Sequence, residues 1–137
     1  MAEEAAKRIH HVAVAVRDLE AGLVFYRDRL GLVLDRRAIL PDLGVEVALL
    51  RLANAAIELI QPTDAANSVG RFIDRRGEGL HHICFTTPDI RTEIALLRAR
   101  GVELVDDQPR EGIAGLVCFV HPRAHAGVLV ELLEEPS

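Results

Sequence analysis

The chain of 137 residues has the length of one ordinary domain, or of two half-size units that share a core. Half of its residues are hydrophobic and 27% are charged, a composition typical of globular proteins rather than disordered ones. The 21 acidic and 16 basic residues give a formal net charge of −5, which disfavours nucleic acid as a partner. No apolar stretch reaches the roughly 20 residues that span a bilayer, so we expect no membrane partner.

The two cysteines, Cys84 and Cys118, stand in apolar segments without the spacing of a disulfide or metal motif. This usage predicts reduced, buried thiols and a cytoplasmic protein. The segment from Met1 to Arg8 agrees with that location, because it lacks an apolar signal core and carries acidic residues that transit peptides avoid.

The chain contains an internal repeat. Residues 9–14 (Ile-His-His-Val-Ala-Val) resemble residues 80–85 (Leu-His-His-Ile-Cys-Phe), an offset of 71 (80 − 9). Each segment leads to an aspartate, Asp18 or Asp89, that is suited to cap a helix with apolar residues at helical spacing. The sequence therefore contains the same strand–helix pattern twice.

In chain order, we predict strand 9–14, helix 19–30, strands 32–34, 45–52 and 56–60, short helix 69–75, strand 80–85, helix 90–97 and strands 102–105, 115–120 and 128–133. Residues 109–112 are predicted to form a turn. The fold class is α+β, with two tandem β-α-β-β-β modules whose sheets curve around one cleft. Residues 1–137 then form a single domain of two repeats, about 9–61 and 80–134, joined by a linker at 62–79.

Four polar residues stand where strands should be apolar. His11 and His82 share strand faces with small residues, which favours an open interior. Glu58 and Glu131 lie in apolar runs, where a carboxylate without a partner would cost several kcal/mol or lose its charge. Because each repeat supplies one histidine and one glutamate at matched positions, we expect four metal ligands in one cleft.

Two imidazoles and two carboxylates suit a divalent transition ion but do not choose among such ions. We expect Co²⁺ or Mn²⁺, with Zn²⁺, Ni²⁺, Fe²⁺ and Mg²⁺ as alternatives. His10 and His81 fall on the opposite strand face, where we expect solvent or packing roles.

At this point the chain resembles the vicinal oxygen chelate, or glyoxalase-like, superfamily over about residues 9–133. Within it, the segments Arg-Gly-Glu-Gly-Leu-His-His-Ile (76–83) and His-Pro (121–122) before Gly-Val-Leu-Val-Glu-Leu (127–132) are similar to those of methylmalonyl-CoA epimerases. The resemblance implies that the metal ligands are His11, Glu58, His82 and Glu131. It further implies that methylmalonyl-CoA is the substrate, epimerised at C2 by proton transfer through a metal-stabilised enolate.

Inversion at C2 needs an acid and a base on opposite faces of the substrate. Glu131 is the candidate for one of these groups. Some members of the epimerase family carry the other glutamate at the position of Val47, whereas this chain has Glu46 one place earlier, where strand parity turns it away from the cleft. Three possibilities remain open for the second transfer: a local bulge that turns Glu46 back toward the cleft, another group, or a water.

Arginines such as Arg75, Arg76, Arg110 and Arg123 could meet the phosphates of CoA, but no CoA site is assigned.

Two other functions are consistent with the same fold. One is a glyoxalase-type metal isomerase that acts on a hemithioacetal; the other is a module that sequesters a ligand without a metal. The exposed edges of short strands also allow a homodimer.

Overall fold

The computed structural model describes residues 7–136, which divide into two compact units. The N-terminal unit consists of residues 11–81. The C-terminal unit consists of residues 82–136 together with residues 7–10 at the start of the described chain. Within these described residues, no helix has both the length and the apolar character needed to cross a membrane.

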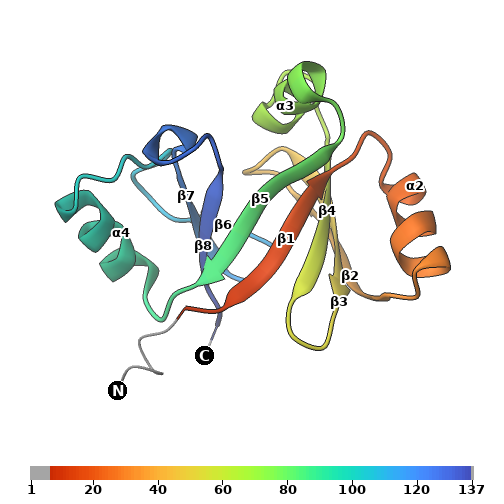
Figure 1. Ribbon diagram of the computed structural model, residues 1–137, viewed down its shortest axis with the longest axis horizontal. Coiled ribbons are helices and arrows are strands. Elements are labelled where there is room, and N and C mark those ends of the chain that lie inside the picture. The colour runs from red at the N-terminus through yellow and green to blue at the C-terminus, as the bar shows by residue number, and fades with distance from the viewer. Residues whose placement is uncertain (1–6, 137) are drawn as a thin grey trace. The chain divides into compact units, whose positions relative to one another are not determined.

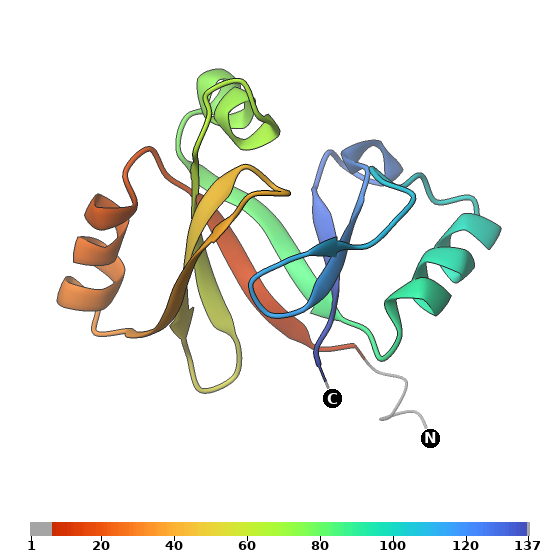
Figure 2. The same cartoon turned by 180° about the vertical axis from the view of Figure 1, so that it is seen from behind.

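The N-terminal unit contains a four-stranded sheet and three helical elements, of which the first two follow each other directly (Figure 1). Its elements are β1 (Ile9–Ala15), α2 (Leu19–Leu23), the π-helix η1 (Val24–Arg29), β2 (Val33–Leu40), β3 (Val45–Arg51), β4 (Ala56–Pro62) and α3 (Ser68–Arg76). The strand order is β2-β3-β4-β1. Strands β1 and β4 are parallel, and the other neighbours are antiparallel, as in the β2–β3 hairpin seen from behind in Figure 2.

The C-terminal unit repeats this plan. Its elements are β5 (Gly79–Thr86), α4 (Ile90–Ala99), β6 (Arg110–Glu111), β7 (Leu116–Val120), the 3-10 turn η2 (Pro122–Ala124) and β8 (Val130–Glu134). The strand order is β6-β7-β8-β5, with β5 and β8 parallel. The α+β class and the two tandem β-α-β-β-β modules are therefore confirmed.

Each unit buries one face of its sheet under the helix that follows its first strand. Leu19 and Leu23 of α2 pack against Ala48, Leu50 and Leu59 of the N-terminal sheet. Ile90 and Ile94 of α4 stand 71 positions after Leu19 and Leu23. In the C-terminal unit they pack against a sheet surface that includes Cys118 and Leu132. Burial of these apolar side chains, at about 25 cal/mol per Å², holds each helix to its sheet.

The second strand of the C-terminal module differs from the prediction. Residues 102–105 form no regular strand and contribute only one bridge, between Leu104 and Val120. The short strand β6 lies instead at residues 110–111, where we predicted a turn. Asp106, Asp107 and Pro109 separate the two segments, and these residue types favour turns over strands because of their side-chain hydrogen bonding and, for proline, the missing N–H.

Candidate metal centre

The first histidine–glutamate pair lies within the N-terminal unit. Parallel pairing of β1 with β4 sets Ala13 opposite Glu58, and His11 precedes Ala13 by two residues on the same strand face. His11 Nε2 lies 3.5 Å from Glu58 Oε1. Both side chains are buried, with 1% of His11 and 6% of Glu58 exposed. The register of two parallel strands therefore brings the predicted imidazole and carboxylate together.

The second pair lies within the C-terminal unit at the equivalent place. Strands β5 and β8 are parallel and set Cys84 opposite Glu131, with His82 two residues before Cys84. His82 Nε2 lies 3.0 Å from Glu131 Oε1, and both residues are buried. Each module thus builds the same pair from the same two strands.

Both pairs occupy the sheet face opposite to the helix of their unit. Strand residues alternate between faces, so Glu58 points away from its neighbour Leu59, which packs under α2. Glu131 points away from Leu132, which packs with α4. The helices therefore support the strands from one side and leave the histidine and glutamate side chains on the other.

One ring contact at the second pair was not predicted from the sequence. Phe119 of β7 lies opposite Glu131 in the register, and its ring meets that of His82 edge to face at 5.5 Å between centroids. Such contacts restrict how an imidazole can rotate. Strand parity could have found Phe119, because it shares the face of Glu131.

The chemistry of these donors fits a divalent transition ion. A buried carboxylate must be paired to keep its charge, and here each one lies beside an imidazole nitrogen. Imidazole nitrogens and carboxylate oxygens are ordinary ligands of Mn, Fe, Co, Ni and Zn. The residues of both pairs are therefore suited to hold such an ion, and nothing in the donor set fixes its identity.

Glu46 lies on the other face of the N-terminal sheet. It is opposite Gln61 in the register and has the parity of Ala48, which packs under α2. Its Oε2 accepts a hydrogen bond of 3.1 Å from Arg37 Nη2, and Arg37 also binds Glu20 at the start of α2. No bulge turns Glu46 toward the face of Glu58, since the register of β3 with β4 is regular throughout.

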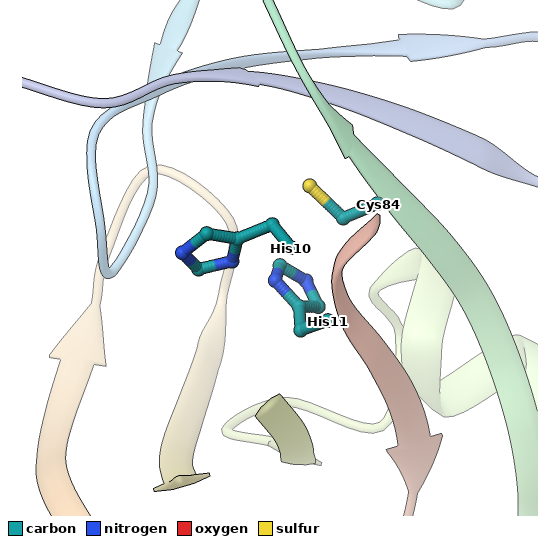
Figure 3. Close-up of side chains that lie close together, drawn as sticks. All are labelled: His10, His11 and Cys84. Carbon is teal, nitrogen blue, oxygen red and sulfur yellow. The ribbon is translucent and has the colours of Figure 1, made fainter. Parts of the chain in front are cut away.

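The two neighbouring histidines have different surroundings. His81 meets the ring of Phe72 at 4.8 Å between centroids, a packing role as predicted. His10 Nε2 lies 3.7 Å from Glu135 Oε2, and a ring nitrogen of His10 lies within 4.8 Å of the Cys84 sulfur. Figure 3 shows His10 and Cys84 with His11, the next residue of β1. His10 is thus enclosed by polar neighbours rather than turned to solvent.

Two repeated β-α-β-β-β modules, each with a buried histidine–glutamate pair at the same place, define a class of paired-module proteins whose buried side chains could hold a metal ion. Residues 10–119 match the model of the Glyoxalase/Bleomycin resistance protein/Dioxygenase superfamily. The chain belongs to this superfamily.

Three relatives illustrate the similarity. The mitochondrial methylmalonyl-CoA epimerase of Mus musculus is 36% identical over 127 residues, which cover 91% of this chain and 71% of the mouse protein. The crystal structure of methylmalonyl-CoA epimerase from Mycobacterium tuberculosis is similar with a TM-score of 0.90 at 34% identity, over 95% of this chain and 89% of that one. A methylmalonyl-CoA epimerase solved with methylmalonyl-CoA and NH₄⁺ has a TM-score of 0.91 at 33% identity, over 96% of both chains.

Proposed function

We propose that this protein epimerises methylmalonyl-CoA at C2 and that His11, Glu58, His82 and Glu131 together hold one divalent metal for this reaction. The observation that carries the proposal is the repeated pair: each module buries one histidine beside one glutamate at the same strand positions. The similarity to methylmalonyl-CoA epimerases over most of the chain supports the choice of substrate.

The proposed metal is Co²⁺ or Mn²⁺, with Zn²⁺, Ni²⁺, Fe²⁺ and Mg²⁺ as alternatives. When bound, such an ion supplies Lewis acidity that stabilises negative charge developing on the thioester oxygen. Both histidines serve as neutral ligands in this scheme, so the carboxylates carry the charge that balances the ion.

Glu131 is proposed as one of the two groups that exchange the C2 proton. Its carboxylate is buried beside His82 on the sheet face opposite to α4, and a carboxylate positioned next to the substrate can exchange a proton as a general acid or base. It would take the proton from one face of the substrate and leave an enolate, and a second acid would return a proton to the other face. The product is the C2 epimer of the substrate, with the same number of protons as the substrate.

The second proton-transfer group has two candidates. Glu46 carries a carboxylate, but that carboxylate is bonded to Arg37 on the face opposite to Glu58. Glu58 is the residue of the N-terminal unit that is equivalent to Glu131, and it lies on the same sheet face as His11. If Glu46→Gln leaves the rate of inversion at C2 unaltered, Glu46 has no part in the mechanism and the transfer belongs to another group or to a water.

Proton NMR of methylmalonyl-CoA in heavy water tests the proposal. We expect metal-stripped protein to leave the C2 proton signal unchanged, and added Co²⁺ or Mn²⁺ to make it disappear far faster than without protein. Glu131→Gln should abolish this loss, whereas Glu111→Gln, the same change on an exposed residue of β6, should not.

Absence of exchange with every metal would refute the epimerase. Turnover of a hemithioacetal would then identify a glyoxalase-type isomerase. Ligand binding that survives loss of all four proposed ligands would identify a sequestering module.

The proposal also includes a cytoplasmic location and a homodimer. Both cysteines of the described chain are free and buried, as expected in a reducing compartment. Strands β2 and β6 are the outer strands of their sheets and offer edges to a second copy. Fractionation of the cell and light scattering after size exclusion test these two statements.

A further inference from the structure

The arginines that could meet the phosphates of CoA differ in their surroundings. Arg123 binds both carboxylate oxygens of Glu103, at 3.2 and 2.7 Å, and holds the pKa of that carboxyl below its usual range. Arg110 binds Asp106 at 3.1 Å. Arg75 and Arg76, in contrast, form no ion pair with a carboxylate among residues 7–136. Only the last two have guanidinium groups available to an external anion.

Helix α3 gathers these two cations with a third. Arg71 precedes Arg75 by one helical turn, and both are exposed. Arg71 donates to the backbone carbonyl of Ala66, which orders its side chain without neutralising its charge. Arg75 and Arg76 lie in the last turn of α3, where positive charge is favourable to the helix, whereas Arg71 and Arg75 repel each other at a spacing of four residues.

An aromatic platform lies at the same end of α3. The Arg76 guanidinium stands over the Phe72 ring, 5.6 Å from its centroid, and the ring of His81 meets Phe72 from the side. Leu80, just before His81, is 73% exposed. A planar guanidinium held on an aromatic ring is a flat cationic surface on which a purine can stack, and an exposed leucine adds apolar contact.

We propose that α3 binds the nucleotide end of coenzyme A, an adenosine that carries a 3′-phosphate and a 5′-diphosphate. This inference rests on the proposed function in so far as the substrate is a CoA thioester. Arg71 and Arg75 contact the phosphates, while Arg76 on Phe72 stacks with the adenine. The pantetheine arm separates the nucleotide from the acyl group, so the nucleotide needs its own site away from the histidine–glutamate pairs.

Binding of adenosine 3′,5′-bisphosphate, measured by calorimetry, tests this site without any turnover. We expect wild-type protein to bind it, and Arg75→Glu with Arg76→Glu to weaken binding by more than about tenfold, since each change removes a charge-assisted contact and adds repulsion. Arg76→Lys, which keeps the charge but not the plane, should weaken binding by a smaller factor. The matched control is Arg100→Glu, an exposed arginine at the C-terminal end of α4, which should bind as wild type. Circular dichroism verifies that each variant is folded.

Kinetics with two substrates provide a second readout. Wild-type protein should show a lower KM for methylmalonyl-CoA than for methylmalonyl-pantetheine, which lacks the nucleotide, and Arg75→Glu with Arg76→Glu should remove most of this difference. Equal KM values for both thioesters in the wild type, with turnover present, would overturn the nucleotide site and leave the epimerase standing. Absence of turnover with both thioesters, with intact binding of the bisphosphate, would refute the epimerase and leave the site standing.

Two binding results would overturn the site itself. One is unchanged affinity for adenosine 3′,5′-bisphosphate in the charge-reversed variant. The other is tighter binding of a single-stranded oligonucleotide with the same dependence on Arg75 and Arg76, which would assign α3 to nucleic acid.

Discussion

Glu58 and Glu131 each lie within 3.5 Å of a histidine nitrogen of their own unit, which gives each carboxylate a defined orientation. Orientation of this kind lowers the cost of assembling a metal site. The proposal of a shared ion makes both carboxylates ligands, although they belong to different modules.

Replacing either carboxylate by an amide tests this assignment. We expect Glu58→Gln and Glu131→Gln each to lower the affinity for Co²⁺ at least about tenfold, because a charged ligand becomes neutral. Titration of Co²⁺ followed by its visible absorption measures the change, and Glu111→Gln should bind as wild type. If only one of the two glutamate variants lost affinity, the four-ligand site would be wrong.

Cys118 packs under α4 with Ile90 and Ile94, on the face away from the histidine–glutamate pair. Burial raises the pKa of its thiol to about 11. At pH 8 only about one thiol in a thousand is then ionised, and the thiolate is the reactive form.

We therefore expect iodoacetamide to label Cys118 far more slowly in folded protein than in urea-unfolded protein. Mass spectrometry of the labelled peptide over time measures the two rates. Rapid labelling of the folded protein at pH 8 would contradict the buried position of this thiol.

At the scale of elements, Asp89 fixes where α4 begins. Its Oδ1 accepts hydrogen bonds of 3.1 Å from the backbone N–H groups of Arg91 and Thr92. The bond from Thr92 is the main cause that holds the pKa of Asp89 below its ordinary value of 3.8. Because the folded state favours the charged form, Asp89 stabilises the fold above that ordinary pKa, and the contribution is lost as the pH falls through the lowered value.

Replacing Asp89 by alanine should lower the melting temperature at pH 7 by about 3 °C. The difference from wild type should shrink as the pH falls from about 5 to 3, because protonation weakens the cap in the wild type. Differential scanning calorimetry at several pH values follows this. A difference that grew toward acid pH would show that Asp89 does not act through its charge.

The sequence predicted those elements whose local signals agree with their surroundings. Asp18 and Asp89 mark the starts of both helices, and apolar spacing placed Leu19, Leu23, Ile90 and Ile94 against the sheets. The π-helix of residues 24–29 was predicted only as helix, because apolar spacing does not distinguish hydrogen bonding to the fourth residue from bonding to the fifth. Strand 102–105 was wrong because alternation over four residues is too short to outweigh the turn residues behind it.

The pairs of the candidate site were predictable for a different reason. A buried acid needs a partner, and the offset of 71 residues marked His11 and His82 as equivalent. The ring contact of Phe119 with His82 and the ion pair of Glu46 with Arg37 were not predicted, since both depend on which residues face each other across strands. Register of this kind is set by the whole sheet rather than by a local motif.

For the whole molecule, a shared ion would link binding to stability. A ligand that binds only the folded state stabilises it by RT ln(1 + [L]/Kd), about 2.7 kcal/mol at one hundred times Kd. Added Co²⁺ should therefore raise the melting temperature, and excess chelator should return it to that of metal-stripped protein. Glu131→Gln should show little of this rise. An equal rise in wild type and variant would mean that the ion binds elsewhere.

Strand β1 belongs to two units at once: residues up to His10 are part of the C-terminal unit, and residues from His11 belong to the N-terminal one. Residues 7–10 precede residues 11–81 in the chain and residues 82–136 follow them, so the two segments of the C-terminal unit emerge from the ribosome before and after the whole N-terminal unit. Residues 7–10 cannot form their contacts until residues 82–136 have been synthesised. Arg8 and His10, for example, both contact Glu135. A nascent chain that ends near residue 81 contains residues 11–81 of the N-terminal unit but only residues 7–10 of the C-terminal unit, so the C-terminal unit can close only after residues 82–136 have been synthesised.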